Sequence, residues 1–200
     1  MKNKKLSGPA VFMYTVILFT AILSFLCFAT YYSGKHNSNA ILWTGIVSFM
    51  ILYHFGLRIL MGEITKLFSV DYKHPLFKKR FFEPSLYKML HVRKWKDKVL
   101  TFDPESFNFR ARTLSQLATT MAKSELDHWI NEIISLTSIF FCFLWGHPFI
   151  FICTAVLAML FDAQFIVVQR YNRPIVLKLM EMKIARDAKK NNTKNGEIIK

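Results

Sequence analysis

Four blocks of apolar residues constrain the fold of this chain more than any other feature of its sequence. They cover about 11–32, 40–61, 130–145 and 149–168. About 20 apolar residues are enough to cross the hydrocarbon core of a bilayer, where each backbone polar group must be paired within its own segment. The sequence therefore predicts an all-α, polytopic integral membrane protein with about four transmembrane helices, forming a single membrane domain over 1–200.

The distribution of Lys and Arg predicts the orientation of these helices. Thirteen lie in the segment 62–129 and nine lie from Gln169 onward, whereas the loop 33–39 holds only Lys35 and the turn 146–148 holds none. Positive residues mark the cytoplasmic side of a membrane. We therefore expect both termini and a basic, helical segment 62–129, between spans 2 and 3, to be cytoplasmic. The Lys- and Asn-rich tail from about 189 to 200 is expected to be disordered.

The net charge of +14 indicates attraction to a membrane rather than to nucleic acid. Anionic lipid contributes about 1 kcal/mol per basic residue near the bilayer surface, so membrane lipid is the expected partner. The sequence has no known nucleic-acid-binding pattern, and no nucleic-acid partner is expected. Because the segment 62–129 is too small to hold an ordinary catalytic core alone, we expect any active site to include membrane helices as well.

The residues Asp103, Pro104 and Glu105 predict a helix start, with an acid at the cap and proline at the first helical position. We expect this helix to run through Trp129 into the third span. The third apolar block is short unless residues 130–132 are also submerged, in which case Glu132 would be buried.

Glu125 and His128 are spaced three residues apart on this helix, so their side chains can touch. A carboxylate beside an imidazole fixes its tautomer and raises its basicity, as a general base requires. The alternative is a surface histidine with a solvated glutamate, and the spacing leaves both interpretations open. A di-iron site needs a second Glu-x-x-His and zinc needs paired Cys or His, so no metal site is predicted.

Two further clusters carry basic and aromatic side chains close to the predicted membrane boundary. Their residues are Arg93, Lys94, Trp95 and Lys96, and Gln169, Arg170, Tyr171, Asn172 and Arg173. Arginine binds phosphate or carboxylate with two parallel hydrogen bonds, which suggests an anionic ligand. Anchoring to lipid headgroups is the alternative for each basic residue, and Trp95 and Tyr171 also fit interfacial aromatics.

Asp162 lies inside the fourth apolar block. An unpaired aspartate there would cost about 2.5–3.5 kcal/mol. We therefore predict a partner for its carboxylate, either Arg58 or His54.

Three stretches together resemble a known family. They are Val92-Arg93-Lys94-Trp95-Lys96, Glu125-x-x-His128-Trp129 and Val168-Gln169-Arg170-Tyr171-Asn172-Arg173-Pro174. In residues, order and approximate spacing they resemble the glycosyl-4,4'-diaponeurosporenoate acyltransferases of staphylococcal carotenoid synthesis. The similarity extends over roughly 77–179, about half of the chain, and does not include the first two apolar blocks.

The resemblance implies an acyltransferase of the bacterial cell membrane that esterifies a sugar hydroxyl of a glycosylated carotenoid, or of a related glycolipid, with a fatty acyl chain. His128 would be the general base and Glu125 would orient it. Arg170, Asn172 or Arg173 would stabilise the oxyanion. The remaining residues of the two clusters would bind substrate or donor. No permanently bound cofactor is expected; acyl-coenzyme A or an acyl-carrier protein would be the co-substrate.

Two interpretations from other classes remain open. The chain would be a non-catalytic scaffold or accessory subunit of a lipid-synthesis complex if His128 and Glu125 have no chemical role. It would be a small membrane methyltransferase of isoprenoid substrates if its donor is S-adenosylmethionine rather than an acyl thioester.

Overall fold

The computed structural model describes residues 7–99 and 103–198, with side chains as far as Asn191. The described residues form helices and no strand. The helices are α1 (Gly8–Tyr32), α2 (Asn39–Ile64), η1 (Thr65–Leu67), η2 (Pro75–Phe77), α3 (Glu83–Met89), α4 (Val92–Trp95), η3 (Lys96–Lys98), η4 (Pro104–Phe107), α5 (Leu114–Thr137), η5 (Ser138–Phe141), α6 (Cys142–Trp145) and α7 (Pro148–Ile198).

Four helical stretches are long and apolar enough to cross a membrane, as the sequence predicts. They are Gly8–Tyr32, Asn39–Leu67, Leu114–Trp145 and Pro148–Asn191. The third stretch joins α5, η5 and α6 into one helical run, which explains how a short apolar block can belong to a span. Glu132 lies inside this run and is buried within the protein, as expected if residues 130–132 belong to the span.

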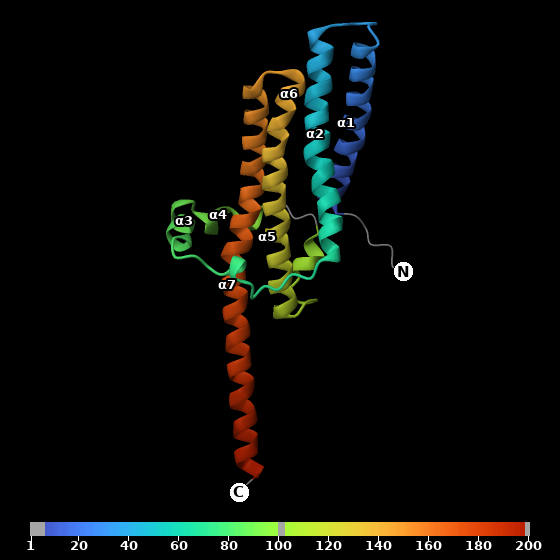
Figure 1. Cartoon of the computed structure of the whole chain (residues 1–200). Coiled ribbons are helices and arrows are strands. Elements are labelled where there is room, and N and C mark those ends of the chain that lie inside the picture. Colours follow the sequence, from blue (N-terminus) through green and yellow to red (C-terminus); the bar gives the residue numbers. More distant parts are fainter. Residues whose placement is uncertain (1–6, 100–102, 199–200) are drawn as a thin grey trace, which may run out of the picture. The chain divides into compact units, whose positions relative to one another are not determined.

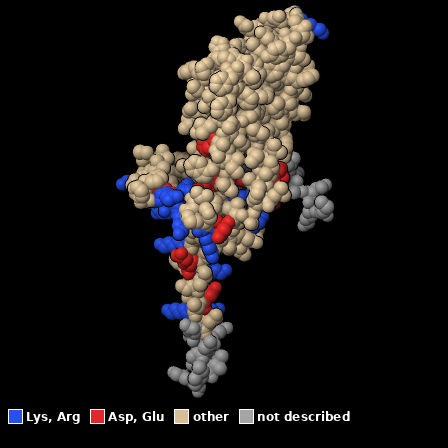
Figure 2. Space-filling model, viewed as in Figure 1, with Lys and Arg blue, Asp and Glu red and all other residues tan. Residues whose placement is uncertain are grey.

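The described residues group into two compact units. The first, here called the bundle unit, comprises Met1–Ser69, Leu100–Pro104 and Asp127–Gln164. The second, here called the basic unit, comprises Val70–Val99, Glu105–Leu126 and Phe165–Lys200. Figure 2 shows that Lys and Arg side chains on the visible face gather over the basic unit, as the charge count predicts.

In the bundle unit, α1 and α2 pack side by side as a hairpin (Figure 1). Their close approach is at Gly45, whose carbonyl accepts a hydrogen bond from Ser24 Oγ at 3.3 Å. A Cβ atom at position 45 would lie 3.1 Å from the Cβ of Cys27 and from the ring of Phe28. Small residues at such crossings let membrane helices approach closely, so Gly45 determines how tightly this hairpin packs.

The core of the bundle unit lies around Ile46, Met50 and Phe151, which are buried. Aromatic rings surround it, and the rings of Phe28 and Trp145 stack with centroids 5.6 Å apart and planes 4° apart. The turn between α6 and α7 is made by Gly146 and His147, both with positive φ, at 73° and 53°. This turn lies where the sequence predicts the hairpin between the third and fourth spans.

In the basic unit, α5 begins later than the sequence predicts. Residues 103–129 are not one continuous helix, because Pro104–Phe107 forms only the short helix η4 and α5 starts at Leu114. Thr113 and Gln116 explain this start. The backbone N–H of Gln116 donates to Thr113 Oγ1 at 3.2 Å, and the backbone N–H of Thr113 donates to Gln116 Oε1 at 2.9 Å. This reciprocal capping box satisfies donors that a helix start leaves unpaired.

The core of the basic unit joins the early turns of α5 to the later part of α7 through Leu117, Ala118, Met121 and Val176. The structure continues α7 as a helix to Ile198, through the stretch from about 189 where the sequence predicts disorder. Helix propensity does not explain this difference, because residues 189–198 combine three Lys with three Asn, one Thr and one Gly, which are weaker helix formers. Extending a helix that has already formed needs no new nucleus, and this favours continuation of α7 into the stretch. Residues 199–200 of the predicted tail lie outside the described residues.

Candidate functional site

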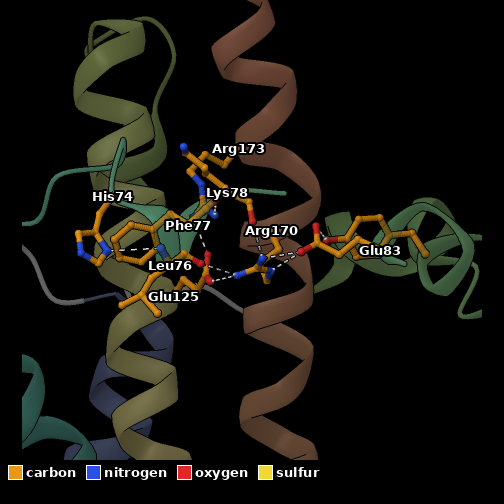
Figure 3. Close-up of polar contacts among 9 residues, drawn as sticks. His74, Leu76, Phe77, Lys78, Glu83, Glu125, Arg170 and Arg173 are labelled. Atoms are coloured by element: carbon orange, nitrogen blue, oxygen red, sulfur yellow. Dashed lines mark hydrogen bonds and ion pairs between the residues drawn. The ribbon is translucent and has the colours of Figure 1, made fainter. Parts of the chain in front are cut away.

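Among the described residues, one cluster of charged and polar side chains is buried in each unit. In the basic unit, Arg170 and Arg173 of α7 meet the carboxylates of Glu83 and Glu125 (Figure 3). We call these four residues the arginine–carboxylate cluster. Glu83 and Glu125 are 2% and 1% exposed, so their charges are withdrawn from water. The two positive charges balance the two negative ones, which is how buried charges are tolerated.

Arg170 uses all five of its N–H donors within the protein. Its Nε donates to Glu83 Oε1 at 2.9 Å, and its two terminal nitrogens donate to Glu83, to Glu125 and to the carbonyls of Leu76 and Lys78. Arg170 thus ties the segment before α3, α3 itself and α5 to α7. No donor of Arg170 is left for a substrate phosphate in this arrangement, because a guanidinium group has only five.

Arg173 is 1% exposed and binds Glu125 Oε2, whereas Arg170 binds Glu125 Oε1. Arg173 donates to Glu125 Oε2 and to the carbonyl of Phe77, and its guanidinium lies 5.1 Å from the centre of the Phe77 ring. Its Nε is buried and has no hydrogen-bond partner among the described residues. Both oxygens of Glu125 are therefore held by arginines.

Glu83 is the residue of this cluster that lies outside the candidate spans, at the start of α3. Burial alone would raise its pKa, but hydrogen bonds from Arg170, from Tyr87 and from the backbone of Arg80 outweigh burial and lower the pKa below its usual value. Tyr87 donates its hydroxyl to Glu83 Oε2 at 2.8 Å. Burial, followed by this bond to an anion, raises the pKa of the Tyr87 phenol. Glu83 is thus held as an anion and Tyr87 as a neutral donor.

Next to this cluster lies an open groove of about 880 Å³, which we call the basic groove. Its lining residues are Lys79, Pro84, Tyr87, Lys88, His91, Arg93, Lys94, Tyr171, Pro174, Ile175 and Lys178. Five of them are Lys or Arg and none is acidic. Arg93, Lys94 and Tyr171 are predicted site residues, so the groove unites members of both basic clusters that the sequence analysis identified.

The other predicted site residues of the basic unit lie near these groups. Lys96 pairs with Asp97 at 2.7 Å, and its Nζ lies 6.0 Å from the centre of the Tyr171 ring. Trp95 donates its ring N–H to the carbonyl of Leu90 at 2.9 Å. Gln169 is buried and Asn172 is half-buried on α7. The expected role of Asn172 as an oxyanion donor stays a prediction.

In the bundle unit, Asp162 of α7 is fully buried at the centre of the second polar cluster. Its Oδ1 accepts hydrogen bonds from His128 Nδ1 at 2.8 Å and from Asn131 Nδ2 at 3.2 Å. Its Oδ2 accepts from the guanidinium of Arg58, whose Nε lies at 3.1 Å. The prediction that Asp162 has a partner, either Arg58 or His54, is confirmed, and the partner is Arg58. We call Arg58, His128, Asn131 and Asp162 the Asp162 cluster.

Three helices hold this cluster, because Arg58 comes from α2, His128 and Asn131 from α5 and Asp162 from α7. Arg58 also donates to the carbonyl of His54 at 2.9 Å, one turn earlier on α2. His54 is 8% exposed, and neither of its ring nitrogens has a hydrogen-bond partner among the described residues.

The contact with Asp162 has a consequence for the chemistry of His128. An ionised carboxylate only accepts hydrogen bonds, so Nδ1 carries the hydrogen and the lone pair of the neutral ring is at Nε2. The His128 side chain is 20% exposed, whereas Asp162 is completely covered. A histidine fixed in this tautomer by a buried aspartate, and itself accessible, has the arrangement of a general base.

Glu125 and His128, which the sequence analysis combined into one pair, thus have different principal partners. Glu125 binds two arginines and His128 binds Asp162. Sequence reasoning singled out Asp162 for its cost in an apolar block, but did not connect it to His128. It missed Glu83, Tyr87 and Asn131. The only local signal for Glu83 is a lone acid in a basic, aromatic stretch.

No group of three or more His, Cys, Asp or Glu side chains in the described part of the chain is arranged to hold a metal ion. One carboxylate oxygen of Asp162 pairs with the guanidinium of Arg58 rather than with a metal ion.

Comparison with known proteins places this chain next to one family. The family model of glycosyl-4,4'-diaponeurosporenoate acyltransferases matches residues 73–182. This range contains the basic groove, the arginine–carboxylate cluster and, of the Asp162 cluster, all but Arg58. No curated protein and no solved structure gives a significant match to the chain.

Proposed function

Because the chain belongs to the glycosyl-4,4'-diaponeurosporenoate acyltransferase family, we propose that it transfers a fatty acyl chain from an acyl thioester to a sugar hydroxyl of a glycosylated carotenoid or related glycolipid. The observation that carries this proposal is the contact between His128 Nδ1 and the buried carboxylate of Asp162 at 2.8 Å. A sugar hydroxyl is a poor nucleophile until a base removes its proton, and His128 supplies that base.

The reaction exchanges a carbon–sulfur bond for a carbon–oxygen bond. The sugar oxygen attacks the carbonyl carbon of the thioester while Nε2 of His128 takes the hydroxyl proton. The tetrahedral intermediate then expels the sulfur, which receives the same proton from the imidazolium. The products are the ester and a free thiol, and His128 returns to its neutral form without any other reactant.

In this proposal Asp162 is a positioning residue and Arg58 supports it. Asp162 holds the hydrogen of His128 on Nδ1 and stabilises the imidazolium that forms during the reaction. Arg58 and Asn131 occupy the remaining acceptor sites of the carboxylate, so Asp162 stays ionised and fixed in direction. Glu125 instead holds Arg170 and Arg173 in place, and so organises the basic unit.

The test is transfer by the purified chain in vesicles that contain a glycosylated carotenoid, with an acyl thioester added outside. Mass spectrometry of the lipids measures the ester and the remaining precursor. We expect ester from the wild type and a loss of about 100-fold or more in the His128→Gln variant, since general-base catalysis contributes about 10²–10⁴-fold. Equal reconstitution and an unchanged unfolding temperature ensure that the loss is chemical.

Other outcomes lead to other functions. Ester formation that is the same in both proteins removes His128 as the base. No ester even from the wild type, with methylation of an isoprenoid lipid by S-adenosylmethionine instead, identifies a methyltransferase. If the wild type shows neither acyl transfer nor methylation but co-purifies with active lipid-synthesis enzymes, the chain is an accessory subunit.

We further propose that the chain crosses the bacterial cell membrane four times, with both termini in the cytoplasm. The positive-inside rule supports this orientation, since Lys and Arg are concentrated in the segment 62–129 and from Gln169 onward. The loop 33–38 holds only Lys35, and the turn 146–147 holds neither Lys nor Arg. A cysteine placed at His147 is then expected to react with an impermeant thiol reagent from outside intact cells, in a background where the three native cysteines are replaced. Labelling of that cysteine only after the cells are opened contradicts the four-span orientation.

A further inference from the structure

The basic groove has more positive charge than its surroundings neutralise. Its five cations are Lys79, Lys88, Arg93, Lys94 and Lys178. Within the described residues, none of them has an ion-pair partner. The acids nearest to them in sequence do not neutralise them. Glu83 is occupied by Arg170 and Tyr87, and Asp97 pairs with Lys96. Glu181 forms no ion pair with Lys178. Five uncompensated cations facing one groove attract an anion that carries several charges.

Two helix faces build this groove. Pro84, Tyr87, Lys88 and His91 follow each other at helical spacing along α3 and the residues just after it, and Tyr171, Pro174, Ile175 and Lys178 do so along α7. The two faces are fixed relative to each other by Arg170 on α7, which binds Glu83 at the start of α3. The arginine–carboxylate cluster therefore fixes the distance between the two helix faces, while its carboxylates stay buried.

The groove also offers aromatic and apolar surface among its cations. The rings of Tyr87 and Tyr171 lie 5.4 Å apart at 75° to each other, and the hydrogen bond from Tyr87 to Glu83 keeps the first ring in place. Pro84, Pro174 and Ile175 add apolar surface. Tyrosine faces stack on nucleobases, so this combination of rings and cations suits a ligand that carries a flat base as well as phosphates.

We propose that the basic groove binds the nucleotide part of the acyl donor, with the cations on its phosphates and the tyrosine rings against its base. This inference rests on the proposed function for the identity of the ligand as an acyl thioester. It narrows the donor to a small phosphorylated nucleotide thioester, of which coenzyme A is the common form. A groove of about 880 Å³ is in the range of sites that bind a small molecule, which favours a nucleotide over the surface of a carrier protein.

Binding is measured with the full chain in nanodiscs of uncharged phosphatidylcholine, by isothermal titration with adenosine 3',5'-bisphosphate. This probe carries the base and phosphates but no acyl group, so its binding does not depend on catalysis. The groove variant combines Lys88→Ala, Arg93→Ala and Lys94→Ala. The matched control combines Lys183→Ala, Arg186→Ala and Lys190→Ala, which removes the same charge from exposed positions of α7 that do not line the groove.

We expect the groove variant to bind the probe about tenfold more weakly or worse, because lost hydrogen bonds to a charged ligand are costly, and the control to stay within about twofold. Tyr171→Leu is expected to weaken binding of the probe but not of inorganic pyrophosphate, which has no base. Equal weakening in the groove and control variants would show that only net charge matters, and this overturns the proposal.

A lipid headgroup shares the phosphate chemistry, so a second arm uses vesicles that contain phosphatidylglycerol. Loss of vesicle binding in the groove variant, with no binding of the nucleotide probe by the wild type, overturns the proposal in favour of a lipid anchor. The His128→Gln variant separates the two hypotheses, because it is expected to keep probe binding and lose acyl transfer. Probe binding through the groove without any acyl transfer by the wild type refutes the proposed function and leaves a nucleotide site.

Discussion

Asp162 Oδ1 lies 2.8 Å from Nδ1 of His128, although the two residues are 34 positions apart in the chain. The aspartate is buried on α7 and the histidine is partly accessible on α5. The other carboxylate oxygen faces Arg58 of α2. The catalytic part of the proposed function depends on this one contact.

Asp162→Asn is expected to lower kcat for acyl transfer by about 100-fold or more, with little change in KM for the donor. Asparagine keeps the size of the side chain, but it no longer favours the imidazolium that forms during the reaction. Steady-state rates with purified protein separate kcat from KM. Asp162→Glu is expected to recover part of kcat, because it restores the carboxylate. A merely structural role of Asp162 would not be rescued by the larger acid, since position 162 is fully buried.

Asp162→Asn also leaves the guanidinium of Arg58 buried without its anion, and the free energy of unfolding is expected to fall by about 3–5 kcal/mol. The double variant Arg58→Met with Asp162→Asn removes both charges. Its loss of unfolding free energy is expected to be smaller than the sum of the losses in the two single variants. Unfolding by denaturant in detergent measures all four proteins. Additive effects of the two substitutions would contradict the pairing of Arg58 with Asp162.

Glu125→Gln tests whether this carboxylate supports the fold or the chemistry. Because it accepts hydrogen bonds from both Arg170 and Arg173, its neutralisation is expected to lower stability by about 3–5 kcal/mol. The kcat of the protein that remains folded is expected to stay within about threefold of wild type, since the partner of His128 Nδ1 is Asp162. Thermal unfolding and active-site titration give the two quantities. A loss of kcat as large as that of Asp162→Asn would instead assign Glu125 to the orientation of His128.

The pKa of Glu83 makes stability depend on pH in a defined direction. Its folded pKa is below the value of 4.5 expected when it is unfolded, so the unfolded chain takes up a proton first as the pH falls. The stabilisation is complete above about pH 4.5 and is lost as the pH falls through the lower, folded pKa. Unfolding temperatures between pH 7 and pH 3 measure this loss. Other carboxyl groups contribute to the same slope, so the informative quantity is the difference from Glu83→Gln, which is expected to lose less stability on acidification.

Gly45→Val is expected to destabilise the hairpin of α1 and α2 by about 1–3 kcal/mol, because a side chain at this position meets Cys27 and Phe28. Gly62 of the same helix has nothing within 4 Å of a Cβ placed on it. Gly62→Ala is therefore the control, and it is expected to leave stability unchanged or raise it by up to about 1 kcal/mol through helix propensity. Chemical unfolding in detergent compares the two. Equal tolerance at positions 45 and 62 would contradict the close approach of α1 and α2.

The features that the sequence predicted correctly follow from local composition and from the cost of burying charge. Long apolar blocks gave the four helical stretches, and Gly146 and Pro148 gave the turn between the third and fourth. The cost of an unpaired aspartate in an apolar block was enough to predict a partner for Asp162, either Arg58 or His54, and the structure shows that it is Arg58. Each inference uses a cost that does not depend on how the helices pack.

Only the tertiary structure decided which acid serves which base. Glu125 lies three residues from His128, and the spacing allows them to touch, but the residues that engage Glu125 lie 45 and 48 positions away. The start of α5 was also misjudged, because the capping box at Thr113 and Gln116 ends the break after η4. Helical spacing identifies the side chains that share a face, whereas the packing of one helix on another determines which distant charge that face meets.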